Sequence, residues 1–359
     1  MEQRLLTRSI RVLLFLILLV TVLIYAKPFL VPLTFAALFA MLLLPLSLRL
    51  EKWGWNRGLA ILVSVLLFVG ILATLITLFI WQVSDISRDA SHIEQNLNEK
   101  LQQLKDFLSN TFGISIQKDD IIQEQQSSGS KITATITGIV TSLGSFLTDF
   151  VLTIVYMFLL LYFRLHLKKF ILMLVPAADK QNAQEVIGEA RGVAQKYLTG
   201  LSWMILSLWI LYGIGFSIVG VNNALFFAVL CGLLEIVPFV GNLTGTAITV
   251  IAVITQGGSS SMIVGVLFTY ALVQFIQTYL LEPLVVGRGV SINPLFTIMG
   301  IVAGEMIWGI PGMILAIPLL GIFKIICDHV EPLKPYGFLI GSKREANRSM
   351  IDKIRQWAK

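Results

Sequence analysis

Long runs of apolar residues, each about as long as a membrane-crossing helix, constrain most strongly how this chain can fold. They lie near residues 10–26, 29–48, 58–83, 139–163, 201–220 and 260–281. A helix of about 20 apolar residues crosses the roughly 30 Å of hydrocarbon in a bilayer. Only 13% of the residues are charged, against about 25% in soluble domains, so most of the surface must face lipid. We therefore predict an all-α polytopic membrane protein with about six full spans.

Charged residues at the ends of these runs predict how the chain is oriented. Cytoplasmic segments of membrane proteins carry an excess of Lys and Arg. The N-terminus, the 49–57 loop, the 164–196 segment and the C-terminal tail are rich in basic residues, so we place both termini in the cytoplasm. The net charge of +6 then follows from this topology, and we expect no nucleic-acid partner.

Segments between the spans differ in composition and divide the chain. Residues 84–131 are rich in charged residues, yet apolar residues recur every three or four positions, which is typical of an amphipathic helix. We interpret this region as an extracytoplasmic helical insertion. The expected order is spans 1 to 3 in 1–83, the insertion in 84–138, span 4 in 139–175, a cytoplasmic amphipathic helix in 176–199, a transport core in 200–323 and a basic cytoplasmic tail in 324–359.

Two further apolar stretches, 224–256 and 295–323, are each interrupted near the middle. The first break lies near 238–242 and the second in the stretch GEMIWGIPG (304–312). Each half has about 14 or 15 residues and would be roughly 21 Å long, too short to cross a bilayer. We therefore predict two re-entrant helical hairpins that enter from opposite faces, with tips that meet near the midplane. Broken helices at this depth form substrate sites in secondary transporters.

Acidic residues beside the two breaks are candidates for binding a substrate or an ion. Glu235 and Glu305 each precede a break. An ionised carboxylate at the bilayer centre costs about 2.5–3.5 kcal/mol on insertion scales, so each must be paired, hydrated or protonated. One hypothesis assigns these residues to coupling with protons or cations. The alternative is structural, with each carboxylate accepting hydrogen bonds from the amides of the opposite arm.

Helix-breaking and capping residues shape the two tips. Pro238 and Gly241 interrupt the first stretch, and Gly241 begins a GxxxG pattern that allows close approach of helices. Asn242 and Thr244 can cap the helix that leaves the first tip, and Pro311 suits the first turn of the helix that leaves the second. Both helix N-termini would then direct partial positive charge toward a hydroxyl-rich or anionic solute.

Polar residues in the span 260–281, and just after it, recur at a spacing that places them on one face of the helix. Gln274, Thr278 and Glu282 lie four residues apart and share a helical face, with Gln277 beside it. This face either lines a cavity or forms hydrogen bonds between helices. Arg288 is either an ion-pair partner of Glu282 or a cytoplasmic gate. The candidate substrate- or ion-binding residues are therefore Glu235, Pro238, Gly241, Asn242, Thr244, Gln274, Gln277, Thr278, Glu282, Arg288, Glu305 and Pro311.

Motifs for enzymatic chemistry are missing from the sequence. It contains no GxxxxGK[ST], HExxH or GxSxG pattern, and its three histidines are widely dispersed. The two cysteines lie in apolar stretches without metal-binding spacing. We expect neither ATP use nor a cofactor, metal site or catalytic nucleophile.

Several stretches resemble the autoinducer-2 exporter (AI-2E) family of bacterial membrane proteins. These are EIVPFVGN (235–242), QTYLLEPLVVGRGVSINPLFTIMGIVAGEMIWGIPGMILAIPL (277–319) and YFRLHLKKFILMLVP (162–176). The resemblance implies a secondary transporter of the bacterial inner membrane that forms homo-oligomers, pentamers among them. Some members are described as exporting autoinducer-2, and others as sodium–proton antiporters.

These observations favour a secondary active transporter that exports a small polar solute such as autoinducer-2, coupled to a proton or sodium gradient. Its partners would be a small polar solute or cation, the lipid bilayer and further copies of the chain. A sodium (or lithium)/proton antiporter is the first alternative. A non-catalytic membrane scaffold or assembly protein is an alternative of another class, and the acidic residues beside helix breaks argue against it. A membrane enzyme is a further alternative, which the missing motifs weaken.

Overall fold

The computed structural model describes residues 2–88, 148–238, 240–286 and 292–342. Throughout these ranges the chain forms helices and short connections without a β-strand, and an isolated bridge joins Ile292 to Gly341. The predicted all-α polytopic membrane fold is therefore confirmed. Much of the predicted insertion 84–138 and the end of the tail lie outside the described residues.

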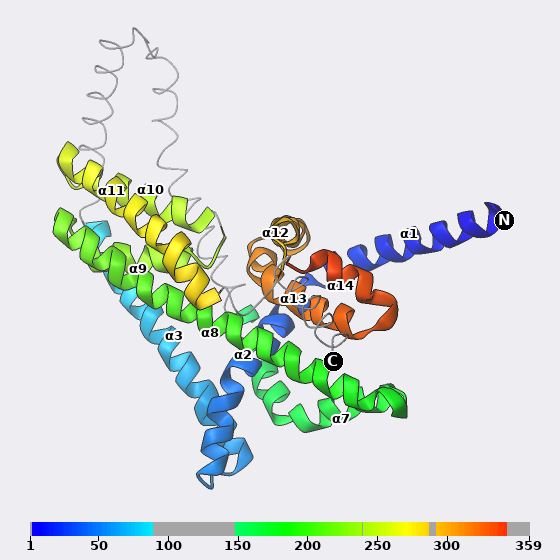
Figure 1. Ribbon diagram of the computed structural model, residues 1–359. Helices are drawn as coiled ribbons and strands as arrows, with labels where there is room; N and C mark the ends of the chain where they lie inside the picture. Colours follow the sequence, from blue (N-terminus) through cyan, green and yellow to red (C-terminus); the bar gives the residue numbers. More distant parts are fainter. Residues whose placement is uncertain (1, 89–147, 239, 287–291, 343–359) are drawn as a thin grey trace, which may run out of the picture.

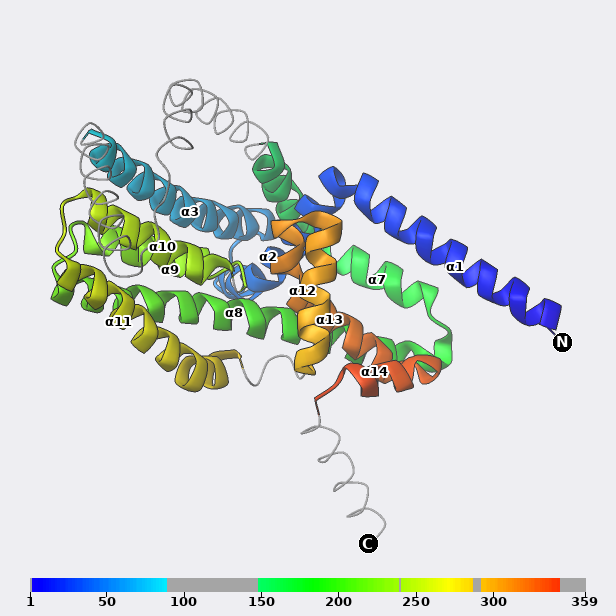
Figure 2. The same cartoon turned by 90° about the horizontal axis from the view of Figure 1, so that it is seen from above.

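The first three helices are α1 (Glu2–Tyr25), α2 (Lys27–Lys52) and α3 (Arg57–Arg88). Helix α1 points away from the rest of the molecule in two perpendicular views (Figures 1 and 2). Helices α2 and α3 form a hairpin closed by a short turn in which Gly54 has a positive φ of 89°. Their apolar faces pack around Ile61 and Met157, which are fully buried.

The helix Thr148–Tyr162 continues into α7 (Arg164–Leu174) through a bend of 70° at Phe163. No residue of α7 is buried. The helix exposes Leu, Ile and Phe side chains together with Lys168 and Lys169. A helix of this composition suits the surface of a membrane, with its apolar side chains in the acyl region and its charges among the headgroups.

A single helix of 40 residues, α8 (Lys180–Val219), runs diagonally through the molecule (Figure 1). It follows a 3-10 turn, η1 (Ala177–Asp179), and ends at Gly220 in the left-handed conformation. The predicted amphipathic helix (176–199) and the predicted fifth span lie on this one helix, which continues through Gly200; their division at the membrane surface stays a prediction. A lone glycine costs a helix only about 1 kcal/mol, and Gly200 is buried in the packed face.

The rest of the chain forms two helix pairs and a span between them. The first pair is α9 (Ala224–Leu234) and α10 (Val240–Thr255), and the span is α11 (Ser260–Ile276), continued by a π-helix, η2 (Gln277–Val286). The second pair is α12 (Pro294–Trp308) and α13 (Ile310–His329). A 3-10 turn, η3 (Glu331–Leu333), leads to α14 (Lys334–Ile340).

Helix lengths test the prediction of two short hairpins. Helices α9, α10 and α12 have 11, 16 and 15 residues, less than the roughly 20 needed to cross a bilayer. Helix α13 has 20 residues and is long enough to cross, because it continues through Lys324 to His329. The prediction of a short arm is therefore wrong for α13. The described residues contain five helices of spanning length, or six with the bent pair around Phe163.

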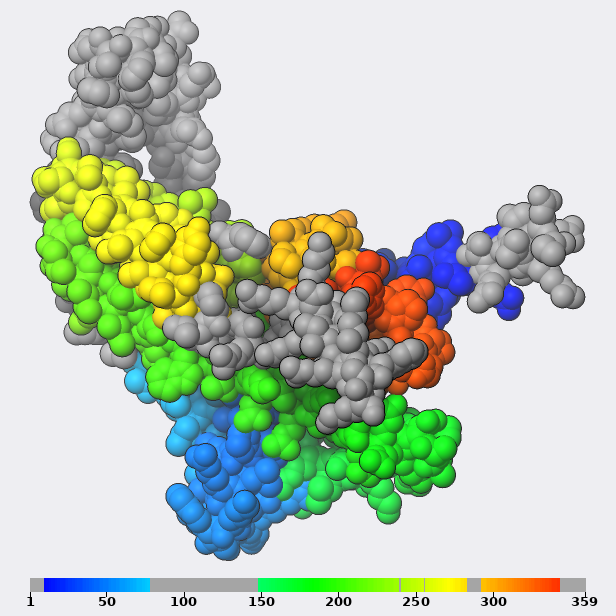
Figure 3. All heavy atoms as spheres, viewed as in Figure 1, coloured from blue at the N-terminus to red at the C-terminus, as the bar shows by residue number. Residues whose placement is uncertain are grey.

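The two helix pairs pack on different parts of the molecule. The first pair and α11 surround a core of Leu208, Tyr212 and Phe216 from α8. The second pair packs near the junction of α1 and α2, where the Trp308 Nε1 donates a hydrogen bond of 2.9 Å to the Leu23 carbonyl. A space-filling view shows the corresponding lobes, with α10 and α11 in one and α12 to α14 in the other (Figure 3).

Candidate functional site

A cluster of polar side chains lies between α8, the first helix pair and α11. It contains Glu235, Asn242, Gln274 and Gln277, together with Tyr212 and Thr278, and we call these six residues the polar cluster. The surrounding core is apolar and includes Phe216, Phe227 and Cys231. Gln277 is 2% exposed and Asn242 6% exposed, and Tyr212 is also buried, while Glu235 and Gln274 are partly exposed and Thr278 is exposed.

Hydrogen bonds join these side chains in two groups, the row Tyr212–Asn242–Gln274–Thr278 and the pair Gln277–Glu235. Tyr212 of α8 donates its hydroxyl to Asn242 Oδ1 at 3.1 Å, and Asn242 Nδ2 donates to Gln274 Oε1. Gln274 Nε2 donates to the Thr278 hydroxyl at 3.5 Å. Gln277 Nε2 donates to Glu235 Oε1 at 2.6 Å, a short distance that suits a charge-assisted hydrogen bond. These contacts tie the tip of the first helix pair to α8 and α11.

Two buried acceptors of the polar cluster have no hydrogen-bond donor among the described residues. They are Glu235 Oε2 and Gln277 Oε1. A third oxygen, Thr246 Oγ1 on α10, is also buried without a partner in the described ranges. Leaving a buried polar atom unsatisfied costs about 1–3 kcal/mol. The cluster can therefore accept a proton, a cation or a ligand that donates hydrogen bonds.

Local sequence explains why Glu235 lies at the tip. Helix α9 ends at Leu234, and Pro238, which cannot donate a backbone hydrogen bond, keeps the chain from continuing directly as one helix. The chain then folds back so closely that a Cβ on Gly241 would collide with the Leu234 carbonyl oxygen. Gly245 likewise faces Cys231 across the pair, with a Cβ position 3.1 Å from Sγ. The predicted close approach at this GxxxG is confirmed.

A change of helix type gives Gln277 its position. The backbone switches from α-helix to π-helix at this residue, and π-helical turns occur frequently at functional sites. The four-residue spacing expected to align Gln274, Thr278 and Glu282 therefore ends there. Gln277, placed only beside that face by the sequence, is the most deeply buried of the group, while Glu282 is exposed.

Side-chain bonding corrects the capping roles predicted at the first tip. The Thr244 hydroxyl donates to the Val240 carbonyl of its own helix at 2.7 Å and is exposed. The Asn242 side chain is engaged by Tyr212 and Gln274, as described above. Neither side chain caps α10, which begins at Val240. Asn242 belongs to the polar cluster and Thr244 does not.

Residues of the second tip lie in a different environment. Pro311 occupies the first turn of α13, as predicted, after Gly309 with φ 69° and ψ −146°, a conformation available essentially only to glycine. Glu305 is exposed, and its backbone carbonyl accepts from the Gly309 N–H. No hydrogen bond of the described residues links Glu305 or Pro311 to the polar cluster. Convergence of the two tips stays a prediction.

One predicted site residue lies outside the described ranges, and one residue of the polar cluster was not predicted. Arg288 lies outside the described residues. Tyr212 was not anticipated, although it continues the buried stripe of α8 formed by Met204, Leu208 and Phe216. A hydroxyl on an otherwise apolar buried stripe was the available signal, because a buried tyrosine usually finds a hydrogen-bond partner.

Apolar helices around a buried carboxylate–amide cluster are typical of a multi-pass membrane transporter. Comparison with known families agrees with this class. The sequence model described as "AI-2E family transporter" matches residues 13–331, and the chain therefore belongs to this family.

Individual relatives carry names of the same kind. The "Putative transport protein YrrI" of Bacillus subtilis (strain 168) is 24% identical over 311 residues, covering 84% of this chain and 87% of the relative. The "Putative transport protein YhhT" of Escherichia coli (strain K12) is 25% identical over 327 residues, covering 90% and 91%. A "Putative transport protein" of Borreliella burgdorferi is 31% identical over 209 residues, covering 56% and 58%. The chain is a multi-pass membrane protein of a transporter family.

Proposed function

We propose that this chain is a secondary active transporter that exports a small polar solute and couples export to a proton or sodium gradient at Glu235. The observation that carries the proposal is the pair of buried acceptors, Glu235 Oε2 and Gln277 Oε1, that have no donor among the described residues. Acidic residues inside membrane domains commonly form proton relays and ion pathways. Glu235 is the one acidic residue that the described contacts place in such a cluster.

The unsatisfied atoms restrict what the cluster can bind. Both are oxygen acceptors, one from a carboxylate and one from a neutral amide. Carboxylate and amide oxygens are ligands that hard cations accept, and a proton on Glu235 Oε2 would also convert this atom from acceptor to donor. An anion would instead be repelled by these two oxygen atoms. The cluster therefore favours a proton or a small cation as the coupling ion.

A polar solute would use the neighbouring amide row. Asn242, Gln274 and Thr278 form a continuous line of hydrogen-bonding groups that leads from buried Asn242 to exposed Thr278. Amides and hydroxyls both donate and accept, which suits a hydroxyl-rich molecule. Autoinducer-2, named in the family description, is a candidate of this chemistry. Binding such a solute would exchange internal hydrogen bonds for bonds to the ligand.

A sodium (or lithium)/proton antiporter is the second candidate. It is favoured by the absence, within the described residues, of any hydrogen-bond donor to Glu235 Oε2 and Gln277 Oε1, because the carboxylate can alternate between a proton and a cation that the amide oxygen helps to bind. In this case no organic solute is needed for ion exchange. Sodium-driven proton movement in liposomes without added solute would distinguish the antiporter from the solute exporter.

We also propose the arrangement in the membrane. Both pairs would be re-entrant hairpins in the bacterial inner membrane, with the termini in the cytoplasm and the chain assembled as a homo-oligomer. The short helices α9, α10 and α12 support this arrangement. For α13, which can cross, labelling of a cysteine placed at Gly309 is decisive. Labelling from the extracytoplasmic side would show that α13 is a full span.

Flux measurements in proteoliposomes test the proposed function. Candidate solutes are scanned under imposed proton and sodium gradients, and gradient-driven flux is expected for at least one of them. Glu235→Gln should abolish coupling while leaving assembly unchanged. Glu185→Gln makes the same chemical change at an exposed site on α8 and should keep wild-type flux. Equal flux in both variants would refute the role of Glu235.

A further inference from the structure

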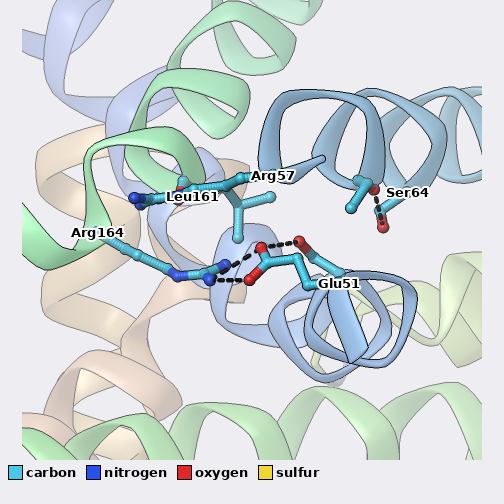
Figure 4. Close-up of polar contacts among 7 residues, drawn as sticks. Glu51, Arg57, Ser64, Leu161 and Arg164 are labelled. Carbon is cyan, nitrogen blue, oxygen red and sulfur yellow. Dashed lines mark hydrogen bonds and ion pairs between the residues drawn. The ribbon is translucent and has the colours of Figure 1, made fainter. Parts of the chain in front are cut away.

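A second polar group lies at the bend between the helix Thr148–Tyr162 and α7, far along the chain from the polar cluster. Arg164, just after the bend, forms an ion pair of 2.6 Å with Glu51 at the end of α2. Arg57, the first residue of α3, donates from Nη2 to the Leu161 carbonyl at 3.3 Å. Figure 4 shows Arg164 pointing toward Glu51, while Arg57 extends toward Leu161. We call Glu51, Arg57 and Arg164 the arginine site.

Charge is not balanced within the arginine site. The site has two guanidinium groups and one carboxylate, and Arg164 Nη2 contacts both oxygens of Glu51, at 2.9 Å and 2.6 Å. Ser47 adds a weak hydrogen bond to Glu51 at 3.4 Å. The carboxylate is therefore committed to Arg164. Among the described residues, Arg57 contacts a backbone carbonyl and the face of Tyr162, 5.5 Å from its guanidinium carbon.

Unsatisfied donors show which kind of group the site could accommodate. Arg57 Nε and Arg164 Nη1 are buried and have no acceptor among the described residues. In the polar cluster the unsatisfied buried atoms of Glu235 and Gln277 are acceptors, whereas here they are donors. Guanidinium groups bind phosphate oxygens with matching fork geometry. Donors of this kind therefore suit an oxyanion such as phosphate.

Neighbouring residues place the site at the level of lipid headgroups. The 70° bend turns the chain from a span into α7, which exposes apolar and basic side chains together. Trp53 and Trp55, in the turn next to Arg57, are 76% and 45% exposed, as is common for tryptophans at membrane interfaces. Arg164 and Glu51 keep 17% and 22% of their side-chain surface exposed, so the site can be reached from outside.

We propose that the arginine site binds the phosphate of an anionic phospholipid. Basic pockets between membrane helices on the cytoplasmic side are suited to such headgroups. The phosphate would accept from Arg57 and from the free edge of Arg164, and the acyl chains would lie along the exposed apolar residues beside the bend. Exposed Leu165 and Phe163 belong to this surface. The site is independent of the transport role of Glu235.

Lipid retention by the purified full chain tests the proposal. The protein is exchanged into a neutral detergent, offered phosphatidylglycerol or phosphatidylcholine, and examined by native mass spectrometry. The wild type should retain phosphatidylglycerol in preference to phosphatidylcholine. Arg57→Gln should reduce this retention about fivefold, the effect expected for one basic residue at an anionic headgroup. Lys52→Gln removes the same charge from an exposed residue of the same turn and should change retention less than twofold.

A second variant, with the opposite expected effect, separates loss of lipid binding from misfolding. Glu51→Gln removes the competing carboxylate and frees Arg164, so phosphatidylglycerol retention should rise. A purely structural role predicts instead that Glu51→Gln and Arg57→Gln both lower thermal stability without changing lipid preference, and this result would overturn the proposal. Equal losses in Arg57→Gln and Lys52→Gln would also overturn it, because they would indicate general surface charge.

Inorganic phosphate distinguishes a lipid from a soluble anion. The thermal stability of lipid-depleted protein is measured with phosphatidylglycerol and, separately, with millimolar phosphate. Stabilisation by the lipid alone, lost in Arg57→Gln, supports a headgroup site. Equal stabilisation by free phosphate, or displacement of the lipid by phosphate, would show that the site takes a soluble anion and would refute the lipid assignment.

Discussion

Replacing Gln277 with leucine tests the polar cluster with little change in side-chain volume. The substitution removes the donor to Glu235 Oε1, which lies 2.6 Å from Gln277 Nε2, and also removes the unsatisfied acceptor Gln277 Oε1. The donor stabilises the carboxylate without a cation, so the expected loss of cation affinity comes from the missing amide oxygen. Residues that support a bound metal ion typically contribute about 10- to 100-fold in affinity, which is about 1.4–2.8 kcal/mol.

The assay is the sodium dependence of transport in proteoliposomes at fixed pH. For Gln277→Leu we expect the half-saturating sodium concentration to rise at least about tenfold, because the variant lacks the Gln277 oxygen that would hold a cation beside Glu235. Thr244→Val is the control, because this hydroxyl on the same hairpin bonds only its own helix in the described contacts. If Gln277→Leu responds to sodium as the wild type does, the carboxylate–amide pair does not bind the coupling ion.

Three further predictions concern stability, each measured by thermal unfolding in detergent. Gly304→Ala should destabilise the protein by about 1–3 kcal/mol, because its Cβ would collide with the opposite arm of the second pair; Gly192→Ala, with open space around its Cβ, should be neutral or stabilising by up to about 1 kcal/mol. Tyr212→Phe should cost about 1–3 kcal/mol by leaving a buried amide oxygen without its donor. Trp308→Phe removes the hydrogen bond to the Leu23 carbonyl of α1. It should therefore cost about 0.5–1.5 kcal/mol and speed proteolysis of α1. Unchanged melting in Gly304→Ala, Tyr212→Phe or Trp308→Phe would contradict the corresponding contact.

Local signals in the sequence were sufficient to predict much of the fold. Apolar runs separated by basic residues indicated the spans, since lipid requires apolar surfaces over a fixed length. Helix-breaking residues located both interruptions. In the structure a new helix begins at each of them, α10 at Val240 and α13 at Ile310. These features depend on a few neighbouring residues, which explains why they could be recognised without tertiary information.

Features set by packing could not be predicted in the same way. The continuity of α8 through Gly200 depends on its neighbours, because an isolated glycine neither requires nor forbids a break. The switch to a π-helix at Gln277 changed which side chains face the core. In the candidate site, Glu235 and Gln274 were identified, while the contribution of Tyr212 required knowledge that α8 packs beside the first hairpin.

Ion-evoked charge movement tests the central claim most directly. Proteoliposomes on a solid-supported membrane are exposed to sodium jumps and pH jumps, with equal protein amounts for the wild type and Glu235→Gln. If Glu235 binds the coupling ion, the wild type should produce a transient current that saturates with ion concentration, and the variant should produce none. A transient of the same size and ion dependence in Glu235→Gln would contradict the account.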